Sequence, residues 1–312
     1  MSSYTADRQG NIYKNDSGQD CFLEKMYGCA FGRALLKPLV NPVLSELGGR
    51  ILDSRLSALA VPAFIRHAGI DMRDYEKRKF WSYNDFFTRR IREGARPVSM
   101  VPEHFVSPCD SRVSVYPIDE NCRVKIKHTP YTVVELLKNP VLAKRYEGGC
   151  LWVFRLCVDD YHRYIYIDDG FESRRVHIDG ALHTVNPVAN DVYPIYKENT
   201  REYALLKTVN FGTVLMMEVG ALMVGRIENV SASGQSKARQ RKKAIFAFGG
   251  STIVLMTQKD RVLPDPDILL NSEKGIETRV HLGEKIGVSE VKNDDGSLFT
   301  GNDDSESISE NL

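Results

Sequence analysis

The sequence lacks the features that mark membrane-spanning, secreted or zinc-binding chains. No run of about 18 uncharged apolar residues occurs, so we expect no transmembrane helix, and no apolar segment follows the polar first residues, so we expect no signal peptide. The six cysteines form no C-x-x-C pair, which favours reduced thiols in a cytosolic compartment. A net charge of +1 provides no general attraction to nucleic acid, so we expect no nucleic-acid partner. What remains is an ordinary globular composition, with 42% hydrophobic and 27% charged residues over 312 positions.

The spacing of apolar residues divides the chain into two kinds of structure. Residues 21–70 carry apolar positions at helical spacing that is broken at Pro38, Pro42 and Gly48, which predicts several short helices. From residue 101 the period becomes two, which predicts strands. These strands are expected at residues 113–116, 124–127, 151–156, 164–167, 175–178, 213–219, 222–227 and 252–255, with one internal helix at 130–145. The sequence therefore predicts an α+β fold, in which a helical N-terminal portion precedes a mainly antiparallel β core.

We divide the chain on this basis into a flexible N-terminus (1–20), a helical portion (21–97), a β-rich core (98–290) and a disordered acidic tail (291–312). The apolar helix faces either pack on the protein's own core or lie on a membrane surface. Residues 72–97 are rich in both aromatic and basic residues. They form either a solvated helix face or a surface that binds anions, with lipid favoured over nucleic acid.

Residues 244–256 hold the most informative stretch, in which two apolar runs flank the sequence Gly-Gly-Ser-Thr. Paired glycines are costly in a strand, and they indicate either a bulge or a hairpin corner between core strands. The alternative is a tight bend that lets the Ser251 hydroxyl attack the carbonyl of Gly250. Such an attack converts the amide into an ester, and elimination and hydrolysis would then cut the chain and leave residue 251 as a pyruvoyl group.

Three other residues are candidates for chemistry. Asp110 lies in a turn before a predicted strand, where aspartate most often caps the backbone. His162 lies between two predicted strands, where an imidazole can act as acid or base near neutral pH, although a structural hydrogen bond is the more common role. His183 has the same two interpretations.

Six segments, taken together and in order, resemble the phosphatidylserine decarboxylase family, of the type whose processing site reads Gly-Gly-Ser-Thr. They are residues 81–90 (WSYNDFFTRR), 94–97 (GARP), 106–110 (VSPCD), 160–163 (DYHR), 184–187 (TVNP) and 248–252 (FGGST). Each motif alone is weak, but the ordered set spans roughly residues 20–290.

The resemblance implies a zymogen of phospholipid biosynthesis that cuts itself between Gly250 and Ser251, aided by Asp110 and a histidine. The fragments 1–250 and 251–312 would stay together as a heterodimer, with further oligomerisation left open. The pyruvoyl group from Ser251 would be the cofactor, would form a Schiff base with phosphatidylserine, and would accept the electrons left when CO₂ departs. His162 would supply the proton that completes phosphatidylethanolamine, and no metal is implied. The substrate places the enzyme peripherally on anionic membranes, at the cytoplasmic face of the cell membrane.

The sequence departs from this family at two places. Many members carry a second histidine three positions after the first, assigned to self-cleavage, but this chain has Ile165 there. Either His162 serves both as the base in self-cleavage and as the acid in decarboxylation, or His183 substitutes as the base. Residues 237–243 (KARQRKK) also differ from the usual pattern, and we expect their positive charge to lie near phospholipid headgroups.

Two alternatives to a membrane-associated decarboxylase remain open. A soluble pyruvoyl-dependent amino-acid decarboxylase could use the same scaffold without needing apolar N-terminal faces. An uncleaved, inactive lipid-binding relative could have lost its base together with the second histidine.

Overall fold

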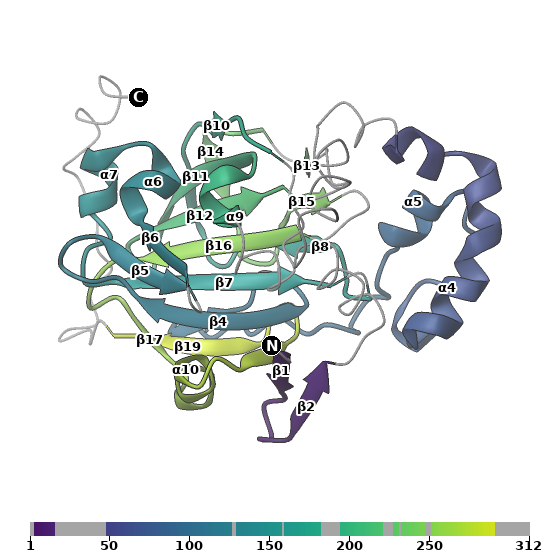
Figure 1. Ribbon diagram of the computed structural model, residues 1–312, viewed down its shortest axis with the longest axis horizontal. Helices are drawn as coiled ribbons and strands as arrows, with labels where there is room; N and C mark the ends of the chain where they lie inside the picture. The colour runs from purple at the N-terminus through teal and green to yellow at the C-terminus, as the bar shows by residue number, and fades with distance from the viewer. Residues whose placement is uncertain are drawn as a thin grey trace, which may run out of the picture.

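The computed structural model describes residues 3–15, 48–126, 129–157, 159–181, 194–220, 227–230, 232–246 and 251–290. In Figure 1 a β-rich body carries most of these residues, and a smaller helical portion lies beside it on the right. Within the described residues the strands are joined almost entirely in antiparallel pairs. The α+β class and the helical N-terminal portion are therefore confirmed.

The main sheet organises the β-rich body and has eleven strands in the part of the chain that the structure describes. Its centre is formed by β12 (Thr213–Val219), β16 (Ser251–Thr257), β7 (Cys150–Leu156) and β4 (Ser111–Pro117), which neighbour one another in this order. On one side follow β11 (Arg201–Thr208), β9 (Gly170–Glu172), β14 (Gln235–Lys237) and β10 (Val176–Ile178). On the other side follow β18 (Glu277–Val280), β1 (Ser3–Ala6) and β2 (Ile12–Asn15).

Three smaller sheets complete the body. β8 (Arg163–Ile165) and β13 (Ile227–Asn229) flank β15 (Lys242–Phe246), and β3 (His104–Val106) and β17 (Val262–Pro264) flank β19 (Lys285–Ser289). β5 (Arg123–Ile126) pairs with β6 (Thr129–Thr132).

The central strands are apolar because both faces of the sheet are covered there. The β7 side chains from Leu151 to Leu156 are all buried, and on β16 the apolar run from Ile253 to Met256 is buried as well. This double burial explains why these segments read as nearly continuous apolar runs, whereas β5 alternates buried and exposed positions. The predicted strands at 113–116, 151–156, 213–219 and 252–255 are confirmed, and residues 222–226 lie outside the described residues.

The prediction of one internal helix at 130–145 is wrong. Its first residues belong to β6, and two short helices follow, α6 (Val133–Leu137) and α7 (Pro140–Lys144). Lys138 ends α6 in a left-handed conformation, and Asn139 caps α7 through its side chain. Among the described residues the β-rich body also contains α9 (Ile195–Glu198) and α10 (Pro266–Glu273). The sequence signal for α10 was Pro266 at the first helical position.

Residues 3–15 form a hairpin that the sequence patterning did not identify. β1 extends the main sheet through parallel pairing with β18, and β2 pairs with β1. Arg8, at the turn, binds Asp265 and Asp267 at distances of 2.7 Å. Four-residue strands with exposed side chains such as Tyr13 show too little alternation of apolar and polar residues to be recognised. The contacts that hold the hairpin also involve residues more than 250 positions away.

The helical portion consists of short helices around an aromatic cluster. In the described residues it contains η1 (Arg55–Ala60), α4 (Val61–Ala68), η2 (Met72–Asp74) and α5 (Tyr83–Phe87), while residues 16–47 lie outside them. Phe64 packs edge-on against Tyr83 and Phe86. No described helix is both long enough and apolar enough to cross a bilayer.

The aromatic and basic residues at 72–97 divide between the interior and the surface. Phe86, Phe87 and Arg89 are buried, whereas Trp81 and Arg90 are exposed. The buried residues of this segment therefore connect the helical portion to the β body and do not form a solvated face.

Candidate active site

The strand register brings four strands to a common end where Ser251 begins β16. Ser251 is paired with Leu156 on β7, and continuing the β7–β4 register places Leu156 opposite Ser111, which is paired with Val280 on β18. Neighbouring strands lie about 4.8 Å apart, so Ser251 is about 10 Å from Ser111 and about 14 Å from Val280 along this row. The sheet therefore gathers Ser251, the start of β4 and the end of β18 at one edge.

Asp110 lies at this edge, immediately before β4, and its carboxylate is buried. Arg96 donates to it from Nε (3.0 Å) and Nη2 (2.8 Å), and the backbone N–H of Leu282 donates to Oδ1 at 2.8 Å. His281 Nδ1 approaches the same oxygen at 3.8 Å. Burial opposes ionisation, but His281 and Arg96 outweigh it and lower the pKa of Asp110. Asp110 is therefore an anchored anion rather than a turn cap alone.

A cavity of about 280 Å³ opens beside Asp110. It is bounded by residues of the helical portion and by the ends of the core strands: Gly69, Ile70, Asp71, Asp74, Tyr75, Arg96, Asp110, Asp159, Asp160, Arg279, Val280 and His281. Charged side chains of both signs line it, so the cavity suits a polar ligand or ordered water. The His281 side chain is 57% exposed here, and Asp110 raises its pKa.

His162 lies next to this edge but is fully buried. Its Nδ1 is 3.0 Å from the carbonyl oxygen of Asp160, and because a carbonyl only accepts, Nδ1 carries the hydrogen. Nε2 has no hydrogen-bond partner among the described residues. Burial, assisted by the charge of Arg89, lowers the pKa of His162 to about 3, so the imidazole is neutral at neutral pH.

Phe87 and Arg89 hold His162 from the helical portion. The ring of Phe87 lies against the imidazole with centroids 3.9 Å apart. Arg89 Nη2 donates to the carbonyl oxygens of Asp159 (2.7 Å) and Asp160 (3.2 Å), the latter also bound by His162. The sequence predicted for both residues either a solvated helix face or an anion-binding surface, and it did not predict their burial.

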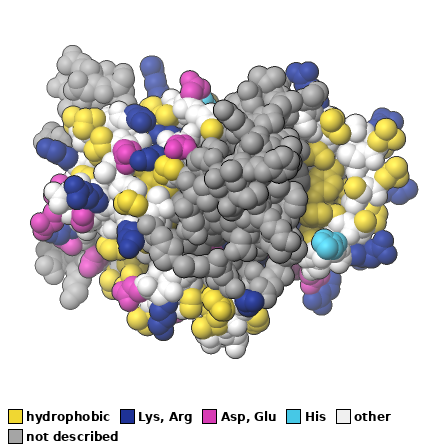
Figure 2. Space-filling view, viewed as in Figure 1, with side chains coloured by type: hydrophobic (Ala, Val, Ile, Leu, Met, Phe, Trp, Pro, Cys, Tyr) yellow, Lys and Arg dark blue, Asp and Glu magenta, His cyan; other side chains and the backbone are white. Residues whose placement is uncertain are grey.

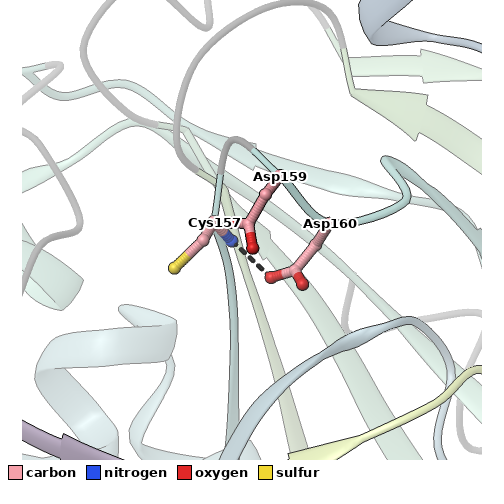
Figure 3. A group of neighbouring side chains, drawn as sticks. All are labelled: Cys157, Asp159 and Asp160. Carbon is pink, nitrogen blue, oxygen red and sulfur yellow. Dashed lines mark hydrogen bonds between the residues drawn. The ribbon is translucent and has the colours of Figure 1, made fainter. Parts of the chain in front are cut away.

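The loop after β7 carries three potential metal ligands, Cys157, Asp159 and Asp160 (Figure 3). The N–H of Cys157 donates to Asp160 at 2.7 Å, as the figure shows. Arg112 lies 2.8 Å from the Asp160 carboxylate and 3.6 Å from that of Asp159, and Arg279 is also 3.6 Å from Asp159. Arginines thus supply the positive charge that this acidic group needs, and ion pairing explains it without a cation.

The prediction that the positive charge of residues 237–243 lies near lipid headgroups is wrong for three of its basic residues. Lys237, Arg239 and Lys243 are buried. Lys237 lies 3.6 Å from Glu172, Arg239 lies 2.9 Å from Asp168, and Lys243 binds Glu218. Desolvated charges need such partners, so the core acids, not a membrane, determine where these side chains lie.

The structure brings together some of the sequence-predicted site residues and leaves others undescribed. Asp110 and the backbone of Ser251 lie at the same sheet edge, and His162 lies close to it through the Cys157–Asp160 loop. Gly250 and His183 fall outside the described residues. Arg96 and His281 were missed as partners of Asp110, because neither lies near it in the sequence.

The family model described as Phosphatidylserine decarboxylase matches residues 83–288. The chain belongs to the phosphatidylserine decarboxylase family. It is 45% identical over 276 residues to the "Phosphatidylserine decarboxylase proenzyme 2" of Clostridium acetobutylicum, covering 88% of this chain and 92% of that protein. It is 38% identical to the phosphatidylserine decarboxylase proenzymes of Clostridium novyi (90% and 97% covered) and Clostridium tetani (78% and 83% covered).

Membership in the phosphatidylserine decarboxylase family confirms the resemblance drawn from the six short motifs. The matched residues include Asp110, His162 and Ser251. The word proenzyme in the relatives' names agrees with an expected cut in the chain. The roles of individual residues stay predictions.

Proposed function

We propose that this chain is a phosphatidylserine decarboxylase proenzyme. It cuts itself between Gly250 and Ser251 and then converts phosphatidylserine into phosphatidylethanolamine and CO₂. The observation that carries this proposal is that Ser251, at the start of β16, and the buried carboxylate of Asp110, immediately before β4, lie at the same edge of the main sheet with β7 between their strands. Family membership supplies the reaction class.

The surroundings of residue 251 fit a pyruvoyl group. The hydroxyl of Thr252, the next residue, is buried without a hydrogen-bond partner among the described residues. Buried hydroxyls normally find partners, so this one is available to a polar group formed beside it at the strand end. A pyruvoyl group supplies an electron-withdrawing carbonyl that accepts the electrons left when CO₂ departs.

The chain's own residues control charge and protons around that position. Asp110, held ionised by Arg96, places a fixed negative charge at the cavity wall, where it attracts a cationic amine. His162 presents an unpartnered Nε2 in a dry environment. Because burial keeps the imidazole neutral, His162 acts as the proposed acid by passing on a proton that it first takes up at Nε2.

Peripheral binding to the cytoplasmic face of the cell membrane is part of this proposal. The helical portion exposes large apolar side chains, among them Leu56 (78%), Leu59 (80%) and Trp81 (67%). Arg55 lies over the Trp81 ring at 5.5 Å, and Figure 2 shows apolar and basic side chains side by side on this portion, at the right. Apolar groups with basic neighbours favour anionic lipid surfaces.

Carbon dioxide release tests the reaction. Wild-type protein is mixed with phosphatidylserine vesicles or with free L-serine, and Ser251→Ala serves as the control. We expect release from vesicles only, and none from the variant. Release from free serine alone would favour a soluble amino-acid decarboxylase, whereas an uncut, inactive wild type would favour a lipid-binding relative.

Vesicle flotation tests the membrane surface separately. The double variant Leu56→Ser/Leu59→Ser removes two exposed apolar side chains and should stay in the dense fraction more than the wild type does. Val141→Ser is the matched control, because Val141 is 74% exposed on α7, at the opposite end of the body in Figure 1. Equal flotation of all three proteins would contradict this part of the proposal.

A further inference from the structure

The self-cleavage proposed above needs a group that accepts a proton near neutral pH, and the two predicted residues described by the structure are poor acceptors. The bidentate contact with Arg96 keeps Asp110 ionised and weakly basic. Burial makes His162 a weak base as well, with its pKa lowered to about 3. A proton acceptor works best when its pKa lies near the working pH. His183, the other candidate base, lies outside the described residues, so we look for a further proton acceptor among the residues that the structure describes at this edge.

Ile165 places an apolar side chain close in the fold to the Asp110 segment. Its backbone N–H donates to the carbonyl oxygen of Pro108 at 3.0 Å, two residues before Asp110. Its side chain is buried in a cluster with Tyr75, Tyr161 and Leu282, and Leu282 is the residue whose N–H donates to the Asp110 carboxylate. Position 165 therefore supplies apolar packing near Asp110 and no titratable group.

His281 lies beside Asp110, immediately after β18. β18 pairs with β4 through Val280 and Ser111, so the next register step places His281 opposite Asp110. Its Nδ1 lies 3.8 Å from the Asp110 carboxylate, and its side chain lines the 280 Å³ cavity. Among the described histidines it is the one that contacts Asp110, and it is exposed enough to exchange protons with solvent.

We propose that self-cleavage depends on His281, which Asp110 holds and which takes up the proton through water, an inference that rests on the proposed function. The strand spacing puts it about 14 Å from the Ser251 row, so it acts through Asp110 and through water in the cavity rather than by direct contact. The Asp159–Asp160 wall of that cavity follows β7, the strand paired with β16.

The Ser251 O–H bond breaks, and the proton passes through water to His281 as the oxygen bonds to the carbonyl carbon of Gly250. The C–N bond between Gly250 and Ser251 then breaks, and the proton returns to the nitrogen of residue 251. The products are an ester and a free amine, with no oxidant, reductant or additional reactant consumed.

The charged groups around His281 determine how its ionisation responds to pH. Its backbone N–H donates to Glu284 at 2.8 Å. The Asp110 contact raises its pKa above the usual 6.5, opposed by desolvation and by Arg96. The remaining charged groups of the cavity wall are Asp71, Asp74, Asp159, Asp160 and Arg279. If neutral His281 is required, the rate of cleavage rises with pH through this raised pKa.

The test measures the rate of self-cleavage in full-length protein made by cell-free synthesis and then shifted to a series of pH values. Denaturing gels follow the conversion of one chain into two. The variants are His281→Gln, His281→Gln with Ile165→His, and His177→Gln. His177 is a matched control, because it pairs with Asp179 at 3.2 Å on the exposed surface, away from the cavity.

We expect His281→Gln to slow cleavage about 10²-fold and to abolish the rise in rate with pH. Ile165→His should restore cleavage in that background by placing a histidine near Asp110, and His177→Gln should behave as the wild type. His281→Gln cleaving at the wild-type rate, or slowly but with the pH rise intact, overturns the inference alone. A wild type that is never cut overturns the proposed function and the inference with it.

Discussion

Two regions of this protein contain several charged side chains each, and they differ in whether solvent reaches those side chains. Around Lys243, the carboxylates of Glu218 and Glu172 are buried together with basic and phenolic partners, and Tyr164 donates to Glu218 at 2.8 Å. Around Asp110, the buried carboxylate meets a cavity, and its partner His281 is more than half exposed. The first region is closed to solvent, and the second is open to it.

The difference shows how one fold separates stability from chemistry. A closed set of charges can neither titrate nor bind a ligand easily, so its expected role is to fix how the small β8–β15 sheet packs on the main sheet. A charged group at a cavity keeps access to protons and substrate, so it can act in a reaction. A substitution in one of these regions can therefore be compared with a substitution in the other region or at a neighbouring residue.

The largest expected effect is on self-cleavage at the open region. Asp110→Asn removes the charge that holds His281 and should slow cleavage about 10²- to 10⁴-fold, as losses of acid–base assistance do. Asp74→Asn is the matched control, because Asp74 binds the same Arg96 at 2.8 Å but is 47% exposed. Gel analysis of newly made protein gives both rates. Equal slowing in the two variants would mean that Arg96, not Asp110, is the important group.

The next effect is on stability at the closed region. Lys243→Met leaves buried carboxylates short of a partner and should lower the free energy of unfolding by about 3–5 kcal/mol. Lys242→Met changes the adjacent, exposed lysine and should stay within about 0.5 kcal/mol of wild type. Urea unfolding followed by fluorescence of the buried Trp152 measures both. Similar losses in the two variants would refute the contrast between the regions.

A smaller effect concerns acid sensitivity from His162. Its folded pKa of about 3 lies below the usual 6.5, so between these values only the unfolded chain takes up the proton. Stability should therefore fall as pH drops from 6.5, with this residue contributing at most about 1.4 kcal/mol per pH unit. His162→Phe keeps a ring against Phe87. In urea unfolding this variant should lose less stability than the wild type as the pH drops from 6.5 (the acid limb of the stability profile). An unchanged limb would place the acid sensitivity elsewhere.

The smallest effect has the opposite sign and belongs to His281. Asp110 raises its folded pKa, so its contribution to stability is present below pH 6.5 and is lost as pH rises through the raised value. Solvent screening makes this contribution weak. In the wild type, the free energy of unfolding should therefore fall slightly as the pH rises through this pKa. His281→Gln should abolish this fall and leave the loss of stability at acidic pH unchanged. A change in the acid limb would contradict the assignment of that limb to His162.

Structural features were predictable from the sequence where neighbouring residues determine them, and not where distant residues or one unusual backbone conformation do. Short apolar runs of strand length located β4, β7, β12 and β16, because these strands are buried within one sheet. The split between α6 and α7 was missed because Lys138, an ordinary helix former, adopts a left-handed conformation there.

The candidate site was predictable in its motif residues but not in its partners. Asp110 and Ser251 stand in recognisable motifs, whereas His281 meets Asp110 only because β18 pairs with β4 across 171 positions of sequence. Lys242 and Lys243 are the same residue type side by side, yet only Lys243 faces Glu218. Such contacts are created by sheet register, which a single sequence does not display.

The central claim is that Ser251 becomes the new, chemically altered end of a cut chain. Intact-mass analysis of the purified protein tests it most directly. The account predicts two chains, residues 1–250 and 251–312, with the shorter one lighter by one ammonia than a chain beginning with serine. A single full-length mass in active protein, or a short chain with an ordinary amino-terminal serine, would contradict it.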